Sequence, residues 1–433
     1  PPPPPSLPLL LLLVALVPGG AGGRCAPEDQ ARFGGGWPAS LDAGLYWFGR
    51  EDTLEKAGGG ERTGLYDPGK SSVIFFHGWT GKDDGSTVAC HRVTTRCSSE
   101  VCPGMAGTLL ADPWLAAGWN VGFFYWDQFS DEECVRDAEQ KIWFDRHGDG
   151  LRWKSFDPRS GVATYYNYRD GVLSVADLCV RAVESALSRH SGPEVRFVGH
   201  SIGSQLATRC AALLHHRGHQ AAPMRLAMLE PYFTKHHLWL FRCVGDSIGS
   251  KPLADEISTD AGVEDYAAVA TRDYARHLWE VKGVVVEIYK SSVLTEMSQF
   301  GDPNAGLQQF STYVEYQPHW CGGVLPLGDV DVAHLSCRHD AAFPVYFLSF
   351  AQPSRPLVAA PLSQGAAPGS ALAACPTPAA SCAYGQLRQW VERQVHVQGH
   401  QKWEQAAGLE TLGLSDDTFA LTPGILEADR ASE

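Results

Sequence analysis

The sequence predicts an α/β fold, with a mostly parallel central sheet, helices on both of its faces, and inserted segments that cap it. Short runs of β-branched and aromatic residues, typical of buried strands, alternate with amphipathic stretches at helical spacing. The pattern Gly-x-Ser-x-Gly, over residues 199–203, falls between one such strand and one such helix. The 433 residues are enough to bury a large core.

Charge and cysteine content exclude some classes of function. The net charge is −14 and no long run of Lys or Arg is present, which argues against nucleic acid as a partner and against electrostatic attraction to anionic lipid. The twelve cysteines are an even number without CxxC or Cys/His zinc spacing, so disulfides are expected rather than a metal site. We expect the neighbouring His215, His216 and His219 to form a solvated helix end, because no acidic or cysteine partner accompanies them.

The chain divides by composition into four parts. Leu7–Val17 is an apolar run followed by small residues up to Gly23, the pattern of a secretory signal that lacks its basic start. We therefore expect a secreted protein, a retained signal-anchor being the alternative. The expected parts are the signal 1–23, an α/β domain 24–352, a Pro/Ala-rich linker 353–380, and a polar tail 381–433 with one helix around 386–397.

The elements expected inside the α/β domain follow from hydrophobic periodicity. Strands are expected over Leu45–Phe48, Ser71–Phe76, Trp119–Trp126, Val195–Val198, Met224–Leu229, Gly283–Tyr289 and Thr312–Tyr316. Helices are expected around 105–117, 172–187 and 203–214, and over 339–350, where Pro344 should interrupt the helix. Two insertions separate these elements, an aromatic-rich one over 128–169 that is expected to be a cap, and another over 232–282.

The Gly-x-Ser-x-Gly pattern predicts a nucleophile elbow, a sharp strand-to-helix turn that presents a reactive serine. A serine on such a turn has strained backbone angles, and Gly199 and Gly203 leave room where a Cβ would clash. The turn lifts Ser201 Oγ clear of the sheet and brings the amide of Ile202 to a helix N-terminus, where negative charge is stabilised. Ser201 is therefore predicted to be a catalytic nucleophile, in preference to a residue of an ordinary strand–helix turn.

A second strand ends in a sequence suited to binding an oxyanion. Ser71–Phe76 runs into His77-Gly78-Trp79, well upstream of the elbow. In α/β-hydrolases the second oxyanion donor lies at this position, so the backbone amides of Trp79 and Ile202 are the predicted pair. Gly78 would let the substrate approach. We expect His77 to be a structural residue at the strand end.

A serine needs a base, and the base needs a carboxylate to orient it. In α/β-hydrolases the acid follows the serine in the chain, and the histidine comes last. Glu230 directly follows the strand that ends at Leu229 and is the first candidate for the acid. Glu296 and Asp302, beyond the next strand, are the alternatives.

Two histidines late in the chain, His334 and His339, are candidates for the base. His200 is excluded because adjacent side chains at a tight elbow point apart, and we expect it to pack beneath the turn. The chemistry requires no metal and no cofactor.

Several of these motifs, in this order, resemble the secreted neutral lipase family, the group that contains pancreatic and lipoprotein lipases and insect phospholipase A1-like proteins. The resemblance covers roughly residues 70–350. Glu230 stands where that family has Asp, and Tyr232 where it has a small residue. The family's Cys-x-His segment matches Cys337-Arg338-His339 and selects His339 over His334. The other matching segments are His77-Gly78-Trp79-Thr80, Tyr125-Trp126-Asp127, Gly199-His200-Ser201-Ile202-Gly203 and Leu229-Glu230-Pro231.

The motifs and the resemblance together predict a secreted serine ester hydrolase of the triacylglycerol lipase type. His339, oriented by Glu230, would take the proton from Ser201, and the substrate would be a lipid or another ester. A phospholipase A1 and a soluble carboxylesterase are the alternatives within the enzymes. From a different class, the alternative is an inactive hydrolase fold kept as a binding or storage protein.

Two further predictions concern the surroundings of the site. Cys321 and Cys337 flank a Gly- and Pro-rich segment before His339, so a disulfide between them would fix the base, and the lipase resemblance points the same way. The apolar run Leu238-Trp239-Leu240-Phe241 follows the predicted acid. We expect it either to pack in the core or to be a lid over Ser201 that opens at a lipid–water interface.

Overall fold

The computed structural model describes most of the predicted α/β domain and two short segments near the C-terminus. The predicted signal, the linker, the apolar run Leu238–Phe241, and the alternative acids Glu296 and Asp302 lie outside the described residues. The described residues are 39–58, 64–81, 94–97, 102, 105–144, 151–157, 160, 162–169, 171, 174–234, 267–295, 305–321, 332–349, 401–407 and 418–423.

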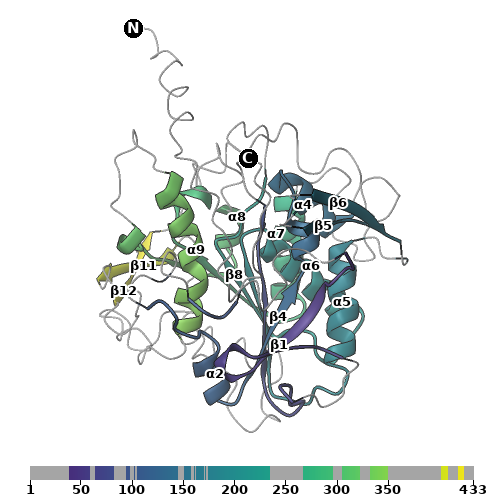
Figure 1. The fold of residues 1–433 in the computed structure, drawn as a ribbon. Coiled ribbons are helices and arrows are strands. Elements are labelled where there is room, and N and C mark those ends of the chain that lie inside the picture. The colour runs from purple at the N-terminus through teal and green to yellow at the C-terminus, as the bar shows by residue number, and fades with distance from the viewer. Residues whose placement is uncertain are drawn as a thin grey trace, which may run out of the picture.

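A ten-stranded sheet forms the centre of the described part of the chain, in the order β12-β11-β10-β9-β8-β7-β3-β4-β1-β2 (Figure 1). The strands from β11 to β4 in this order run parallel to one another. At one edge β12 is antiparallel to β11, and at the other β1 is antiparallel to β4 and β2 is antiparallel to β1. The bounds are β1 Gly44–Phe48, β2 Leu54–Lys56, β3 Ser72–Phe76, β4 Asn120–Tyr125, β7 Val195–His200, β8 Arg225–Leu229, β9 Val285–Lys290, β10 Thr312–Glu315, β11 Gln401–Ala407 and β12 Thr418–Pro423. The predicted mostly parallel sheet is confirmed.

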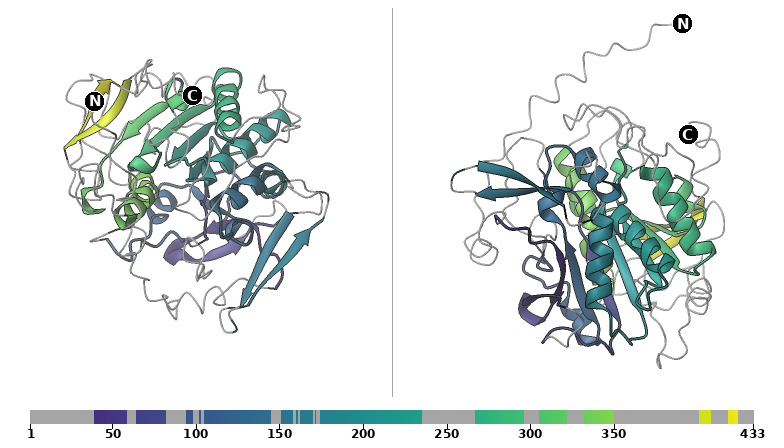
Figure 2. Two further views of the ribbon diagram at one scale, coloured as in Figure 1. Left: turned by 90° about the horizontal axis from the view of Figure 1, so that it is seen from above. Right: turned by 90° about the vertical axis from the view of Figure 1, so that its right-hand side faces the viewer.

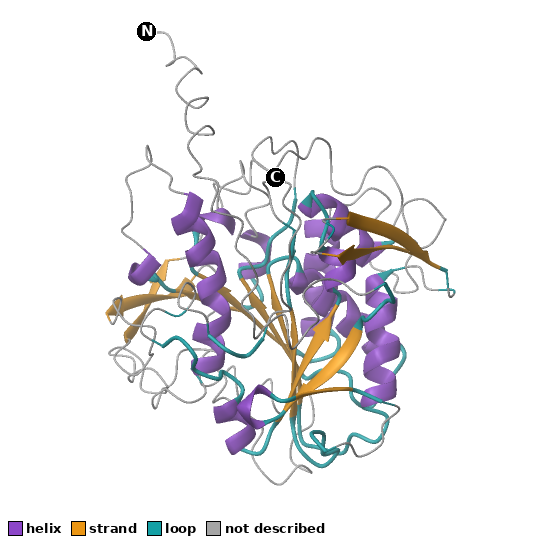
Figure 3. Ribbon diagram, viewed as in Figure 1, coloured by secondary structure: helices purple, strands orange, loops and turns teal. Residues whose placement is uncertain are grey.

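Helices cover both faces of this sheet, as Figure 3 shows. β3 illustrates why the strands are apolar throughout: all five of its residues are buried, with Ile74 and Phe76 in the core on one face and Val73 and Phe75 in the core on the other. The first core includes α4 (Val135–Trp143), α5 (Val175–Ala186), α6 (Gly203–His216) and α7 (Ala267–Glu280), and the second includes α2 (Asp112–Ala116) and α9 (Val332–Leu348).

The chain reverses its direction across the sheet between β3 and β7. From β3 it moves to β4 on one side, and from β7 it moves to β8 on the other. In open α/β sheets, ligands bind at the carboxyl ends of the strands that flank such a reversal. The segments that follow these two strands are the predicted oxyanion loop, residues 77–81, and the elbow.

The insertion predicted to be a cap is partly helical and partly a hairpin. α3 (Asp127–Ser130) and α4 follow β4, and β5 (Leu151–Asp157) pairs with β6 (Val162–Tyr168) in a separate antiparallel sheet. Figure 2 shows this hairpin projecting from the body of the molecule. β6 is exposed along nearly its whole length, whereas β5 buries Trp153 and Phe156.

Two predictions about the C-terminal half need correction. α9 is continuous through Pro344, although Pro344 was expected to interrupt it. Buried residues on both sides of the proline, among them Ala342 and Tyr346, hold the helix against the sheet and offset the missing backbone hydrogen bond. The C-terminal segment 381–433 was expected to be a polar tail, but it contributes β11 and β12, whose Trp403 and Phe419 are buried in the same core as α9. The helix expected around 386–397 lies outside the described residues.

Three disulfides join pairs of described residues, Cys97–Cys102, Cys179–Cys210 and Cys321–Cys337. The predicted bond between Cys321 and Cys337 is thereby confirmed. The bond between Cys179 and Cys210 joins α5 to α6 and was not predicted, because at helical spacing both cysteines look like ordinary core residues. No helix in the described part of the chain is long and apolar enough to cross a membrane.

Candidate active site

The elbow between β7 and α6 has the tight geometry that its glycines suggest. Ser201 has a φ of 57°, in the left-handed region that non-glycine residues rarely adopt. A Cβ at Gly199 would lie 2.5 Å from the Gly203 carbonyl oxygen, and one at Gly203 would lie 2.3 Å from that of Phe76. The Ser201 amide donates to the Leu229 carbonyl at 3.0 Å, which ties the turn to the end of β8. Glycine is therefore required at both positions.

The predicted oxyanion loop lies against this serine. A Cβ at Gly78 would lie 2.7 Å from Ser201 Cβ and 3.2 Å from Ser201 Oγ, so only glycine fits between the loop and the elbow. The next residue, Trp79, supplies the predicted amide donor, and its indole Nε1 donates to the Glu132 carbonyl at 2.8 Å. The second predicted donor, the amide of Ile202, belongs to the buried elbow itself.

His77 holds the start of the loop, in the structural role expected for it. The Trp126 amide donates to His77 Nε2 at 3.2 Å, which leaves the ring proton on Nδ1. Nδ1 lies 2.9 Å from the Gly78 carbonyl oxygen and can donate to it. The Trp126 indole donates in turn to the His77 carbonyl at 2.9 Å. The bonds to the Gly78 and His77 carbonyls restrict the backbone immediately before Trp79.

Glu230 and His339, separated by 109 residues in the chain, come into contact. Glu230 follows β8, is fully buried, and has a φ of 46°. Its carboxylate accepts hydrogen bonds from the amides of Ser291 and Ser292 and from the Ser292 hydroxyl. Glu230 Oε2 also lies 3.1 Å from His339 Nδ1. Neutral donors from the end of β9 thus fix the carboxylate where it can orient this imidazole.

His339 lies on α9, and several contacts hold this helix against the elbow. His200 Nε2 lies 2.9 Å from the His339 carbonyl oxygen, and the two imidazole rings are 4.7 Å apart. Burial, and to a smaller extent the proximity of His339, lowers the pKa of His200 to about 3, so His200 is neutral and can donate to this carbonyl. The Ser291 hydroxyl donates to the Arg338 carbonyl at 2.6 Å. The side chain of His334, the alternative base, lies outside the described residues.

Because His339 Nδ1 faces Glu230 Oε2, Nε2 is the ring nitrogen that could act as a base. Among the described residues, Ser201 Oγ makes no hydrogen bond, and the residue is 8% exposed. In serine hydrolases, hydrogen bonds between the serine and its base are often long without substrate and shorten when substrate binds. No group of three His, Cys, Asp or Glu side chains within the described ranges is arranged to hold a metal ion.

The sequence analysis missed three residues that support the site. Ser291 and Ser292 directly follow β9, so the parallel neighbours β8 and β9 bring them beside Glu230. Two hydroxyl residues after a strand were a usable signal for this contact. Glu132, which holds the Trp79 indole, gave no comparable signal, because its position depends on how the 128–169 insertion folds.

The strand order, the reversal between β3 and β7, and the serine elbow at the end of β7 define the class of protein. The chain has the α/β-hydrolase fold, with inserted segments, as predicted. This fold hosts many activities, so the activity has to be argued from the site.

No family model and no curated protein sequence matches the chain. The fold is similar to several solved structures. A Thermus thermophilus protein is 13% identical over 64% of this chain and 89% of its own, with a TM-score of 0.28. A hormone-sensitive lipase from a metagenome library is 15% identical over 77% of this chain and 96% of its own, with a TM-score of 0.31. A carboxyl esterase from the mycorrhizal fungus Tuber melanosporum is 12% identical over 80% of this chain and 98% of its own, with a TM-score of 0.31.

Proposed function

We propose that this protein is a secreted serine ester hydrolase of the lipase type. The observation that carries the proposal is the 3.1 Å contact between His339 Nδ1 and Glu230 Oε2 beside the Ser201 elbow. A serine, an imidazole and a carboxylate in this chain order are the groups that acyl transfer to serine requires in this fold.

The proposed mechanism uses these contacts. Glu230 accepts from His339 Nδ1–H and so keeps the lone pair on Nε2, which takes the proton from Ser201 Oγ as that oxygen attacks the ester carbonyl. The amides of Trp79 and Ile202 stabilise the oxyanion. His339 then gives its proton to the leaving alcohol. A water molecule, deprotonated by His339, attacks the acyl-enzyme, releases the acid and restores Ser201.

Two observations support the lipase type and the secreted location. The motifs around residues 77–80, 199–203, 229–231 and 337–339 resemble those of secreted neutral lipases. The three disulfides among the described residues suit an oxidising compartment. The lid expected at Leu238–Phe241 would supply contact with a lipid–water interface. Trp239→Ser with Phe241→Ser should then weaken the rise in activity from monomeric to emulsified ester, and equal loss on a soluble ester would assign this run to the core.

A fluorophosphonate probe tests the proposal directly. It should label the wild-type protein and fail to label Ser201→Ala. Unlabelled wild-type enzyme is then compared on a triacylglycerol emulsion, a diacyl phospholipid and a short soluble ester. Absence of labelling would leave the inactive binding or storage protein as the better assignment. A preference for phospholipid or for the soluble ester would instead assign a phospholipase A1 or a carboxylesterase.

A further inference from the structure

The oxyanion loop rests on one short segment of the insertion, residues 129–132. The Trp79 indole donates to the Glu132 carbonyl at 2.8 Å, and the hydroxyls of Thr80 and Ser130 lie 2.8 Å apart. A Cβ at Gly81 would lie 2.0 Å from the same Glu132 carbonyl oxygen, so the loop and the segment are packed backbone against backbone. A shift of the segment would therefore be passed to the loop.

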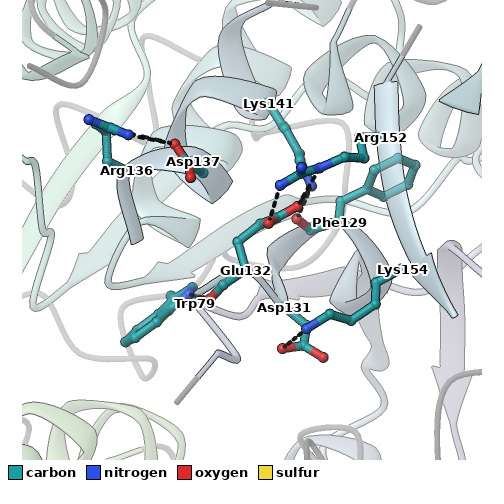
Figure 4. Close-up of polar contacts among 9 residues, drawn as sticks. All are labelled: Trp79, Phe129, Asp131, Glu132, Arg136, Asp137, Lys141, Arg152 and Lys154. Atoms are coloured by element: carbon teal, nitrogen blue, oxygen red, sulfur yellow. Dashed lines mark hydrogen bonds and ion pairs between the residues drawn. The ribbon is translucent and has the colours of Figure 1, made fainter. Parts of the chain in front are cut away.

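The side chain of Glu132 holds this segment in place. Its carboxylate, only 3% exposed, accepts from Lys141 of α4 and from two guanidinium nitrogens of Arg152 in β5 (Figure 4). Lys141 Nζ also donates to the Phe129 carbonyl at 2.9 Å. Lys141 thus ties the two ends of the segment together, because it binds both the Phe129 carbonyl and the Glu132 carboxylate.

A second ion pair docks the same segment onto the hairpin. Lys154 lies two residues after Arg152, so both side chains leave β5 on one face. Lys154 Nζ lies 3.0 Å from Asp131 Oδ1, and both side chains are fully buried. Gln128 also donates to the Lys154 carbonyl at 3.1 Å. Two consecutive acids, Asp131 and Glu132, therefore pair with two alternate bases of β5.

We propose that Glu132, held by Arg152, is a positioning residue for the oxyanion hole. The proposal rests on the proposed function, in which the amide of Trp79 is one of two oxyanion donors. The other donor, Ile202, is buried at the start of α6, whereas the Trp79 loop depends on the segment 129–132 for its position. Glu132 and Arg152 touch no substrate in this proposal. They act by keeping the Trp79 amide aimed at the developing oxyanion.

Arg152→Gln is the variant of choice, because the Arg152 side chain is 48% exposed and its loss opens no cavity in the core. A misplacement of about 1 Å can cost about a hundredfold in rate, so a partial loss of roughly tenfold in kcat is expected, with KM within about twofold of wild type. Arg152→Lys should recover part of the loss. Trp79→Phe, which removes the indole donor, should lower kcat by a similar factor. When Trp79→Phe is combined with Arg152→Gln, the loss in kcat should be smaller than the two single losses predict together.

The decisive readout is the ratio of kcat for an ester to kcat for the matching thionoester. Sulfur accepts hydrogen bonds more weakly than oxygen, so a displaced amide slows the ester and spares the thionoester. The ratio should fall by roughly the same tenfold in Arg152→Gln. A variant that is merely less stable, or partly unfolded, would lose activity on both substrates equally.

Arg217→Gln is the matched control. It breaks an ion pair with Glu184 at the end of α6 opposite the elbow, with side chains 36% and 31% exposed, and should leave the ratio unchanged. If wild type hydrolyses both substrates and Arg152→Gln does not change the ratio, the positioning role is wrong and the proposed function stands. If the wild type is neither labelled by a fluorophosphonate nor active on either substrate, both are overturned.

Discussion

The two sides of the candidate site are held by different kinds of interaction. On the acid–base side, Glu230 is fully buried and fixed by neutral amide and hydroxyl donors from the end of β9, and it contacts His339. On the oxyanion side, the Trp79 loop is held through Glu132, whose carboxylate is fixed by Lys141 and by the half-exposed Arg152. The first arrangement belongs to the main sheet, and the second depends on a projecting hairpin.

The comparison indicates that the two sides should respond to different perturbations. Hydrogen bonds from neutral donors to a fully buried carboxylate are little affected by ionic strength, whereas ion pairs that reach the solvent are screened by salt. Changes on the acid–base side should remove the chemistry altogether, and changes on the oxyanion side should reduce its rate.

The largest effects are expected from the nucleophile and the base. Ser201→Ala and His339→Ala should each lower kcat by about a millionfold, because the triad acts as a unit, and the double variant should be scarcely worse. Steady-state rates with active-site titration measure this. Substantial activity in Ser201→Ala would refute the mechanism. An active His339→Ala beside an inactive His334→Ala would reassign the base.

A smaller loss is expected from the acid. Glu230→Gln should lower kcat on the order of ten-thousandfold, because a neutral amide orients the imidazole less well and does not stabilise the imidazolium. Glu230→Asp should keep part of the activity, since a carboxylate remains near His339. If Glu230→Gln is close to wild type while Glu296→Gln or Asp302→Asn is not, the acid lies after the next strand.

Acid should destabilise the fold by protonating two buried histidines, His200 beside the acid–base side and His190 at the amino ends of β3 and β7. Burial lowers the pKa of His200 to about 3 and that of His190 to about 4, below the 6.5 of an unfolded chain. The unfolded state therefore binds more protons than the folded state below about pH 6.5, so stability should be complete above that pH and be lost progressively toward pH 4. At pH 5 each histidine should cost on the order of 2 kcal/mol. Midpoints of thermal unfolding, measured from pH 6.5 to pH 4, test this dependence of stability on pH.

His190→Phe is the variant that sharpens this test. Both ring nitrogens of His190 are buried without a hydrogen-bond partner among the described residues, so an apolar ring should be tolerated. The variant should have a shallower loss of stability between pH 6.5 and pH 4 than wild type. Parallel slopes would show that His190 does not contribute.

The smallest effect should come from salt and should be confined to the oxyanion side. Raising NaCl to about 1 M shortens the Debye length to about 3 Å and should lower kcat on a short soluble ester by about twofold to threefold. Arg152→Gln should show no such dependence, because the screened contact is already missing. An equal salt effect in wild type and in Arg152→Gln would show that the oxyanion side is not the salt-sensitive side of the site.

The parts of the site that sequence could predict are those that local order determines. The elbow is recognisable because its glycines, its strand and its helix are contiguous, and Glu230 because it directly follows a strand. His339 was selected over His334 only by the resemblance to a known family. These residues come together because parallel strands end at one edge of the sheet, which the alternation of elements already implies.

The parts that sequence could not predict depend on the docking of distant segments. Arg152 and Glu132 are both charged residues in a polar insertion, and nothing local indicates that one lies over the other. β11 and β12 were missed for a related reason: β11 is largely polar, and only a partner strand makes Trp403 a core residue. The sequence thus predicted a mostly parallel sheet, but not the strands at its C-terminal edge or the contacts made by the insertion.

The disulfide between Cys179 and Cys210 has a consequence for biosynthesis. It joins residues 31 apart, so it closes a covalent ring that contains β7 and Ser201, and both sulfurs are buried in the finished protein. An oxidant must reach them before α5 and α6 pack, which makes the order of oxidation and collapse part of the folding pathway. Refolding of the reduced chain should therefore speed up with added disulfide oxidant, whereas refolding of the oxidised chain should be indifferent to it.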